Sequence, residues 1–433
     1  MPYLQKHTLK ISVNKCILLI LVLCLCISRY VFAQDTIDED ELFSSPDSIF
    51  TTEKIIDNTI LEEEKKTIGI SGEAISVIEF SGTRDFIKDG DDKDNALSSY
   101  IQGTLFFDAR LKRGLKCFAN MEMQYNPNAD GDMNFDGDQD AQEADIFLQE
   151  FFIDFNVQNS VYFRAGKQVL QWGRCYLWNP SDLINVEKKS FKEKIGAREG
   201  AYGIKMHKPY GTQYNIYSFL DIGDDPNSNE IGVAFKLEFL LGRTEMAFST
   251  WNKKGYGPVY AYDFSTRILG IDTMGEAALS HETTIDEPIE DRWIPRVCIN
   301  FGKSFDCMDI HDRISMNLEC YYNDAGLTAT VLSEAEWISL LSNNRYEANN
   351  VSKYYVALFT TTRKFILSDM NLILNLIRNL NDESSILTAG ITYTDIHDFS
   401  IGLTVYSYLG TSNCEYTFQN NAITTQLIVG ILF

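Results

Sequence analysis

The chain from about residue 68 onward consists of short segments in which apolar and polar side chains alternate. In the segment from Glu230 to Leu241, every second side chain is apolar, namely Ile231, Val233, Phe235, Leu237, Phe239 and Leu241. The segments from Arg313 to Tyr322 and from Phe399 to Tyr406 alternate in the same way. A period of two is the signature of a β-strand, and no helix reproduces it.

About eighteen such segments follow one another, and the connections between them fall into two classes. They lie near residues 68–80, 97–110, 115–126, 144–156, 160–172, 199–208, 212–221, 230–240, 242–252, 257–267, 268–280, 293–302, 312–323, 352–364, 369–379, 384–394, 398–409 and 422–433. Short turns alternate with longer connections, at 127–143, 173–198, 222–229, 281–292, 324–351 and 410–421. This alternation is typical of an up-and-down outer-membrane barrel.

These features predict an all-β fold, a transmembrane antiparallel up-and-down β-barrel over residues 67–433. We expect about eighteen strands, with sixteen as the alternative, and either number leaves room for an aqueous pore. Strands of about ten residues match the tilted span of a bilayer core. Closure of the sheet is required because lipid offers no partner to an unpaired backbone group.

The last segment alternates up to the final residue, Phe433. It resembles the closing strand of outer-membrane β-barrels, whose terminal aromatic residue is recognised by the barrel-assembly machinery. The resemblance implies that Phe433 is read by that machinery, and that outer-membrane lipid surrounds the protein.

The first 66 residues differ from the rest. Lys6, Lys10 and Lys15 precede an apolar run from Cys16 to Ile27, and residues 31–33 resemble a small-x-small cleavage site. This pattern predicts a signal peptide over residues 1–33, because the apolar run is shorter than the roughly 20 residues of a membrane-spanning helix. Residues 34–66 are strongly acidic and are expected to form a flexible periplasmic extension. We therefore expect export to the cell outer membrane.

The charge balance narrows the possible functions. The chain has 38 Lys and Arg against 61 Asp and Glu, for a net charge of −23. Such acidity argues against a nucleic-acid partner, which requires a basic surface over the phosphates. The four histidines after the signal are scattered, and six cysteines remain there without a regular spacing. The sequence therefore predicts no enzyme, disulfide framework or zinc site.

A run of about 25 residues carries the most specific motif. From Arg164 it reads Arg-Ala-Gly-Lys-Gln-Val-Leu-Gln-Trp-Gly-Arg-Cys-Tyr-Leu-Trp-Asn-Pro-Ser-Asp. The pattern Gly-Lys-Gln, Trp-Gly, Asn-Pro-x-Asp resembles porin-like outer-membrane families, including uncharacterised exported barrels and relatives of the alginate-export type. The resemblance implies passage of solutes across the outer membrane.

The residues of this run suggest two arrangements. The loop after the strand is long and rich in aromatic residues, so it folds into the lumen as a constriction in the first arrangement. The second places its aromatic side chains in the girdle at the membrane interface, with Asn179 and Pro180 in a plain turn. The first arrangement makes channel-lining or constriction residues of Arg164, Gln168, Trp172, Trp178, Asn179 and Asp182.

The phase of the strands predicts further lumen-facing charges, of both signs. The candidate channel-lining residues among them are Lys116, Glu122, Arg313 and Glu319, and the same phase turns Asp108, Arg110, Glu150, Asp154, Lys236 and Glu238 inward. Facing rows of opposite sign select polar solutes, and rings of one sign select ions. The sequence does not decide between these arrangements, because the register of the strands is unknown.

One outer loop matches the twelve-residue calcium loop Asp-x-Asn-x-Asp-Gly-x5-Glu. The metal ligands would be Asp132, Asn134, Asp136, Asp138, Asp140 and Glu143. The flanking segments are strands, so Ca²⁺ would act as a structural clip on a surface loop.

Together these features predict an outer-membrane porin-like channel for passive diffusion of small hydrophilic solutes. The alternative is a non-conducting barrel that anchors or assembles a surface polymer or adhesin. The sequence leaves open whether copies of the chain form a homo-oligomer.

Overall fold

The computed structural model describes residues 67–84, 96–111, 114–127, 144–182, 200–223, 231–283, 291–328, 332–343, 345–396 and 398–433. Contacts divide the chain into residues 1–63 and 64–433, and every described residue belongs to the second unit. The predicted signal peptide and acidic extension therefore lie outside the described residues.

The described part of the chain is dominated by eighteen β-strands, with one short helix, α3 (Glu334–Ser342). The strands are β1 (Thr67–Thr83), β2 (Ala96–Arg110), β3 (Lys116–Tyr125), β4 (Ala144–Val157), β5 (Val161–Gln168), β6 (Ala201–Tyr210), β7 (Tyr214–Asp221), β8 (Gly232–Leu241), β9 (Thr244–Lys253), β10 (Val259–Ile268), β11 (Ile271–Thr283), β12 (Asp291–Cys307), β13 (Ile310–Asn323), β14 (Tyr354–Thr362), β15 (Met370–Asn379), β16 (Ser385–Ile396), β17 (Phe399–Leu409) and β18 (Asn421–Leu432). No described helix is both long enough and apolar enough to span a bilayer.

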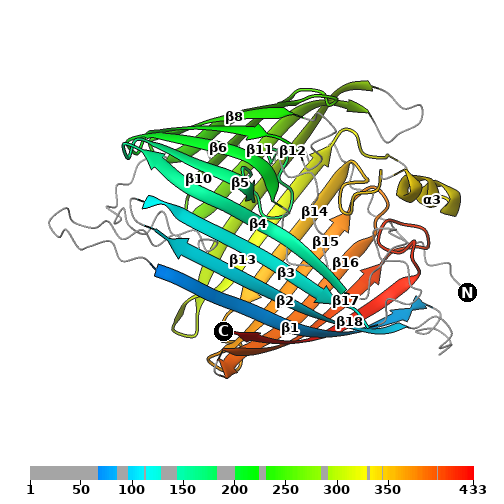
Figure 1. Ribbon diagram of the computed structural model, residues 1–433. Coiled ribbons are helices and arrows are strands. Elements are labelled where there is room, and N and C mark those ends of the chain that lie inside the picture. Colours follow the sequence, from blue (N-terminus) through cyan, green and yellow to red (C-terminus); the bar gives the residue numbers. More distant parts are fainter. Residues whose placement is uncertain are drawn as a thin grey trace, which may run out of the picture. The chain divides into compact units, whose positions relative to one another are not determined.

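The strands form one closed antiparallel sheet. Each strand pairs with its neighbours in the sequence, and β1 pairs with both β2 and β18 (Figure 1). The predicted up-and-down β-barrel is thereby confirmed, and its strand number is eighteen.

The apolar side chains of the strands point outward. On β8, Phe235 and Leu237 are 52% and 45% exposed, whereas Lys236 between them is 7% exposed. The same inversion holds on β13, where Leu318 is 40% exposed and Glu319 is fully buried. An apolar exterior and a polar interior are the opposite of a water-soluble sheet and are characteristic of a lipid-facing barrel.

The connections sort by length to the two ends of the barrel. Residues 158–160, 211–213, 242–243, 269–270 and 308–309 make tight turns at one end. The other end receives the long connections, among them 126–143, 169–200 and 324–353. β5 ends at Gln168, so the expected strand over 160–172 was too long and Trp172 lies in the connection.

The seam between β1 and β18 closes the barrel at the chain's last residue. The Gly72 N–H donates to the Phe433 carbonyl at 2.8 Å, and the Phe433 N–H donates to the Gly72 carbonyl at 2.9 Å. The Phe433 ring lies over Gly72, where a Cβ would be 2.5 Å from the ring and 2.8 Å from the Thr104 carbonyl oxygen. The ring therefore covers a glycine of the seam and requires that glycine.

Gly72→Val should destabilise the seam, because the new side chain must displace the Phe433 ring or the Thr104 backbone. Overpacking of this kind costs about 1–3 kcal/mol. The measurement is the free energy of unfolding from the heat-modifiable fraction in a urea titration. Gly103→Val on β2 is the matched control, because a Cβ there meets no atom within 4 Å. Equal stabilities of the two variants would contradict this account of the seam.

Candidate functional site

The connection after β5 turns back onto the inner wall of the barrel. We name residues 169–182 the inner segment. Gln168 closes the strand, because its side-chain amide donates to the carbonyls of Arg164 at 3.3 Å and Gly203 at 3.2 Å. The Val169 N–H then donates to the Glu150 carboxylate at 2.8 Å. Gln168, a predicted lining residue, is thus fully buried where the chain leaves the wall.

Two tryptophans of the inner segment pack against inward-facing side chains. Trp172 is buried with Phe219 of β7 and Trp251 of β9. Trp178 stacks on Tyr321 of β13, with 5.3 Å between ring centroids and an angle of 8° between the rings. Both predicted residues therefore lie inside the barrel and not on its outer face.

Two carboxylates of the wall bind the backbone of the inner segment. Glu276 of β11 accepts from the N–H groups of Cys175 at 2.6 Å and Ser181 at 3.1 Å, and also from the Arg174 N–H and the Ser181 hydroxyl. Glu319 of β13 accepts from the N–H groups of Leu177 at 3.0 Å and Trp178 at 2.6 Å. The Tyr176 N–H and the Asn300 side chain complete its partners.

These carboxylates are almost inaccessible to solvent, with 2% exposure for Glu276 and none for Glu319. A buried charge of this kind is costly unless hydrogen bonds replace its water. Each carboxylate accepts four hydrogen bonds here, which matches its lone-pair capacity. Charge-assisted bonds are about twice as strong as neutral ones, so the two side chains fix the path of the inner segment.

Arg174 anchors the inner segment to three further strands. Its guanidinium donates to Glu238 of β8 at 2.6 Å and also to Glu245 of β9 and Asp263 of β10. Burial acts to lower the pKa of Arg174, but the surrounding carboxylates outweigh it and raise that pKa above its ordinary value. Lys236 of β8 lies 3.3 Å from Asp263 and donates to the Trp172 carbonyl at 2.8 Å. The inner segment thus covers the wall from β8 to β13.

The Trp-Gly and Asn-Pro-x-Asp parts of the motif meet where the inner segment folds back on itself. A Cβ at Gly173 would lie 2.4 Å from the Asn179 side-chain oxygen, so only glycine allows this approach. The Asp182 N–H donates to the Asn179 carbonyl at 3.0 Å. Asn179 and Asp182, both predicted site residues, are buried and form this turn.

The predicted residues on β3 to β5 lie on another part of the wall. Arg164 makes two hydrogen bonds to Asp154, at 2.7 and 2.9 Å, and its guanidinium lies 3.7 Å from the centre of the Phe152 ring. Lys116 lies 3.5 Å from Asp108. These four charged side chains remain between 26% and 30% exposed, whereas Asp263, Glu276 and Glu319 beneath the inner segment are almost inaccessible to solvent.

The remaining predicted residues do not lie together with the inner segment. Glu122 accepts from the Gln149 amide at 3.0 Å. Arg313 donates to the carbonyls of Lys364 and Phe365, at the end of the short turns and away from the inner segment. The candidate calcium ligands, residues 132–143, lie outside the described residues.

Sequence reasoning left three important residues out of the candidate site, namely Arg174, Asp263 and Glu276. Arg174 stands inside the recognised motif, but its carboxylate partners lie on three strands whose register the sequence does not give. Glu276 and Asp263 were detectable as charges at mid-strand positions facing inward. Such a charge needs a partner, although the phase does not name it.

The long connections at the barrel mouth pack on one another and on the inner segment. α3 lies among these connections (Figure 1) and begins after the N-cap Ser333. Its Trp337 stacks on Phe418, with 4.5 Å between the ring centroids. Asn349 connects its own loop to the inner segment and to the connection before β18. Its carbonyl accepts from the Trp178 indole at 2.8 Å, its N–H donates to Glu415 at 2.8 Å, and its side chain accepts from Tyr416 at 2.8 Å.

A closed antiparallel barrel with an apolar exterior, a charged interior and an infolded connection is the architecture of porins. Solved structures agree with this class. The fold is similar to a BenF-like porin from Pseudomonas fluorescens Pf-5, with a TM-score of 0.57, 9% identity and coverage of 84% of this chain and 98% of that chain. For OccAB1 from Acinetobacter baumannii the TM-score is 0.55 and the identity is 10%, with coverage of 84% of this chain and 96% of that chain. For OccK9 from Pseudomonas aeruginosa the TM-score is 0.56 and the identity is 9%, with coverage of 84% of this chain and 98% of that chain.

At these identities the likeness concerns the fold. No protein-family model matches the sequence, and no curated protein matches it.

The stability of the mouth loops should fall as the pH rises. Burial raises the pKa of Glu415 from 4.5 to about 8, and the nearby carboxylate of Asp382 adds to this increase. A carboxyl with a raised pKa in the folded state stabilises that state fully below pH 4.5, and this contribution is lost as the pH rises through 8. We expect opening at Asn349, measured by amide hydrogen exchange, to increase at least about tenfold between pH 6 and 9 after correction for intrinsic exchange.

Glu415→Gln is the matched variant, because it removes the titration and keeps the shape of the side chain. Its corrected exchange should be nearly independent of pH. An unchanged pH dependence in this variant would assign the effect to another group.

Proposed function

We propose that the protein is an outer-membrane channel for passive diffusion of small hydrophilic solutes. The observation that carries this proposal is the unequal covering of the inner wall. The inner segment lies on β8 to β13 and buries Asp263, Glu276 and Glu319, whereas charged pairs on β2 to β5 remain partly exposed. A closed barrel of eighteen strands has an interior wide enough for water.

The inner segment narrows this pore from one side. Its backbone is bound to Glu276 and Glu319, so it forms a fixed part of the lining. The wall of β2 to β5 presents Lys116 and Arg110 beside Asp108, and Arg164 paired with Asp154, so charges of both signs lie close together. Paired charges of both signs favour polar solutes over ions of one sign.

Other features of the sequence fit this assignment. The signal peptide and Phe433 support export and assembly into the outer membrane, where lipid contacts the apolar exterior. A homo-oligomer remains compatible with such a barrel. The proposed protein is a channel and not an enzyme.

The test is single-channel conductance of the purified, heat-modifiable barrel in a planar bilayer. We expect discrete steps that small polar solutes block. Truncation of Trp178 to Ala removes a buried aromatic side chain, a change that costs about 3–5 kcal/mol in packing. The inner segment should then loosen, and the current and its noise should rise.

Trp293→Ala is the matched control, because Trp293 of β12 is 43% exposed on the outer face. It should leave the conductance unchanged. A folded barrel without steps would contradict the channel function and favour the alternative, a non-conducting barrel that anchors or assembles a surface polymer or adhesin. Equal currents in the wild type and Trp178→Ala would contradict the constriction.

We also propose that residues 132–143 bind Ca²⁺ as a clip on an outer loop. The proposal is supported by the oxygen ligands at the spacing of the calcium loop. Isothermal calorimetry of the intact barrel should show one site per chain, and Asp132→Ala/Asp136→Ala should abolish it. The absence of binding heat at millimolar Ca²⁺, together with no thermal stabilisation by Ca²⁺, would remove the claim.

A further inference from the structure

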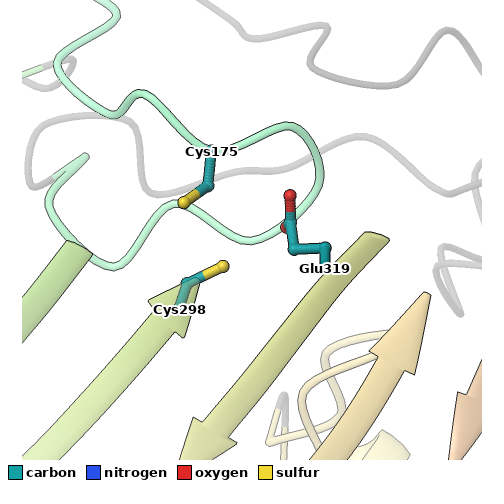
Figure 2. Close-up of side chains that lie close together, drawn as sticks. All are labelled: Cys175, Cys298 and Glu319. Atoms are coloured by element: carbon teal, nitrogen blue, oxygen red, sulfur yellow. The ribbon is translucent and has the colours of Figure 1, made fainter. Parts of the chain in front are cut away.

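Two thiols meet where the inner segment lies on the barrel wall. The sulfur atoms of Cys175 and Cys298 and a carboxylate oxygen of Glu319 all lie within 4.8 Å of one another. Figure 2 shows Cys175 on the inner segment above Cys298 of β12, with Glu319 on the next strand. Both cysteines are buried.

The surrounding hydrogen bonds hold the two thiols in place. The Cys175 N–H donates to Glu276 at 2.6 Å, and three N–H groups directly after Cys175 bind Glu319. Asn300, two residues after Cys298, donates to the same Glu319 at 3.0 Å. Docking of the inner segment therefore brings Cys175 to Cys298 and to no other cysteine of the described residues.

A metal ion between these groups fits less well. Thiolates suit soft or borderline cations, with the carboxylate as a third ligand. Each oxygen of Glu319 already accepts two hydrogen bonds, so coordination would release donors that hold the inner segment. A bond between the two sulfurs uses no lone pair of Glu319 and so does not compete with these hydrogen bonds.

We propose that Cys175 and Cys298 form a disulfide that ties the inner segment covalently to β12. A disulfide requires a sulfur separation of about 2.05 Å, which side-chain rotation and a small shift of the segment supply. The bond would join two parts of the chain that are far apart in the sequence.

The oxidant is a second disulfide, either of a protein or of a small molecule, in the oxidising space outside the cytoplasm. One cysteine thiolate attacks a sulfur of this disulfide, forms a mixed disulfide and displaces the first thiolate. The other cysteine thiolate then attacks the cysteine sulfur of this mixed disulfide and displaces the remaining half of the oxidant as the second thiolate. The two cysteines lose two protons and two electrons, and the incoming disulfide becomes two thiols.

The chemistry of the docked site indicates when this exchange takes place. The adjacent Cys298 thiol acts to lower the pKa of Cys175, but burial and the carboxylates of Glu276 and Glu319 outweigh it and raise that pKa to about 11. Exchange needs the thiolate and access to the reagent. The bond therefore forms while the inner segment docks, after the two cysteines have met and before they are buried, and completed docking then protects it.

The test is to refold the reduced full-length barrel in a buffer of oxidised and reduced glutathione, alkylate the free thiols under denaturing conditions and map the peptides. We expect one crosslink, between Cys175 and Cys298, and alkylation of every other cysteine of the chain, among them Cys117, Cys307, Cys320 and Cys414. Cys298→Ser should abolish the crosslink. Cys320→Ser is the matched control on the neighbouring strand and should retain it.

Two outcomes would overturn the proposal. One is alkylation of all the cysteines in a correctly folded barrel. The other is a stoichiometric zinc ion, found by native mass spectrometry after refolding with Zn²⁺ and glutathione, with both thiols still reduced.

A second readout rests on the proposed channel function. The oxidised barrel should give steady current steps, and Cys298→Ser should add fluctuations because its inner segment is held by noncovalent contacts alone. If the crosslink is mapped in the wild type but its current noise equals that of Cys298→Ser, the disulfide does not restrain the inner segment. Absence of current in both proteins would overturn the channel function, while peptide mapping would still decide whether the bond exists.

Discussion

The whole structure depends on the requirement that every backbone hydrogen-bonding group facing lipid be paired. A sheet meets this requirement only by closing, and here the closure is made by β1 and β18, with reciprocal bonds between Gly72 and Phe433 at its end. Closure also fixes the direction of every side chain. Apolar residues turn to the lipid and polar ones turn to an interior too wide for them to fill.

A wide interior makes room for a connection, but a connection has unpaired backbone groups of its own. The inner segment meets this problem with side chains and not with a sheet. Glu276 and Glu319 together accept six of its N–H groups, and Lys236 donates to the Trp172 carbonyl. Glu319, which the strand phase predicts as a channel-lining charge, is thus a structural support, whereas the charged pairs on β2 to β5 keep their contact with solvent.

The architecture was readable from the sequence because a period of two and the sorting of short and long connections are local signals. The expected strand number follows from such signals. The end of β5 could not be predicted in this way, because apolar residues (Val169, Leu170 and Trp172) continue past Gln168 although the chain leaves the wall there. The partners of Arg174 were also out of reach, since three strands of unknown register supply them. Position along a strand gives the direction of a side chain but not its neighbours.

Asn349 has a consequence for how this surface can vary. Its carbonyl holds the Trp178 indole, while its N–H and side chain hold Glu415 and Tyr416. Outer loops of barrels usually change freely because nothing inside depends on them. Here Asn349 of one loop bonds both a second loop and the inner segment, so the mouth and the lining are structurally coupled. A mutation of Asn349 would therefore disturb the mouth and the lining together.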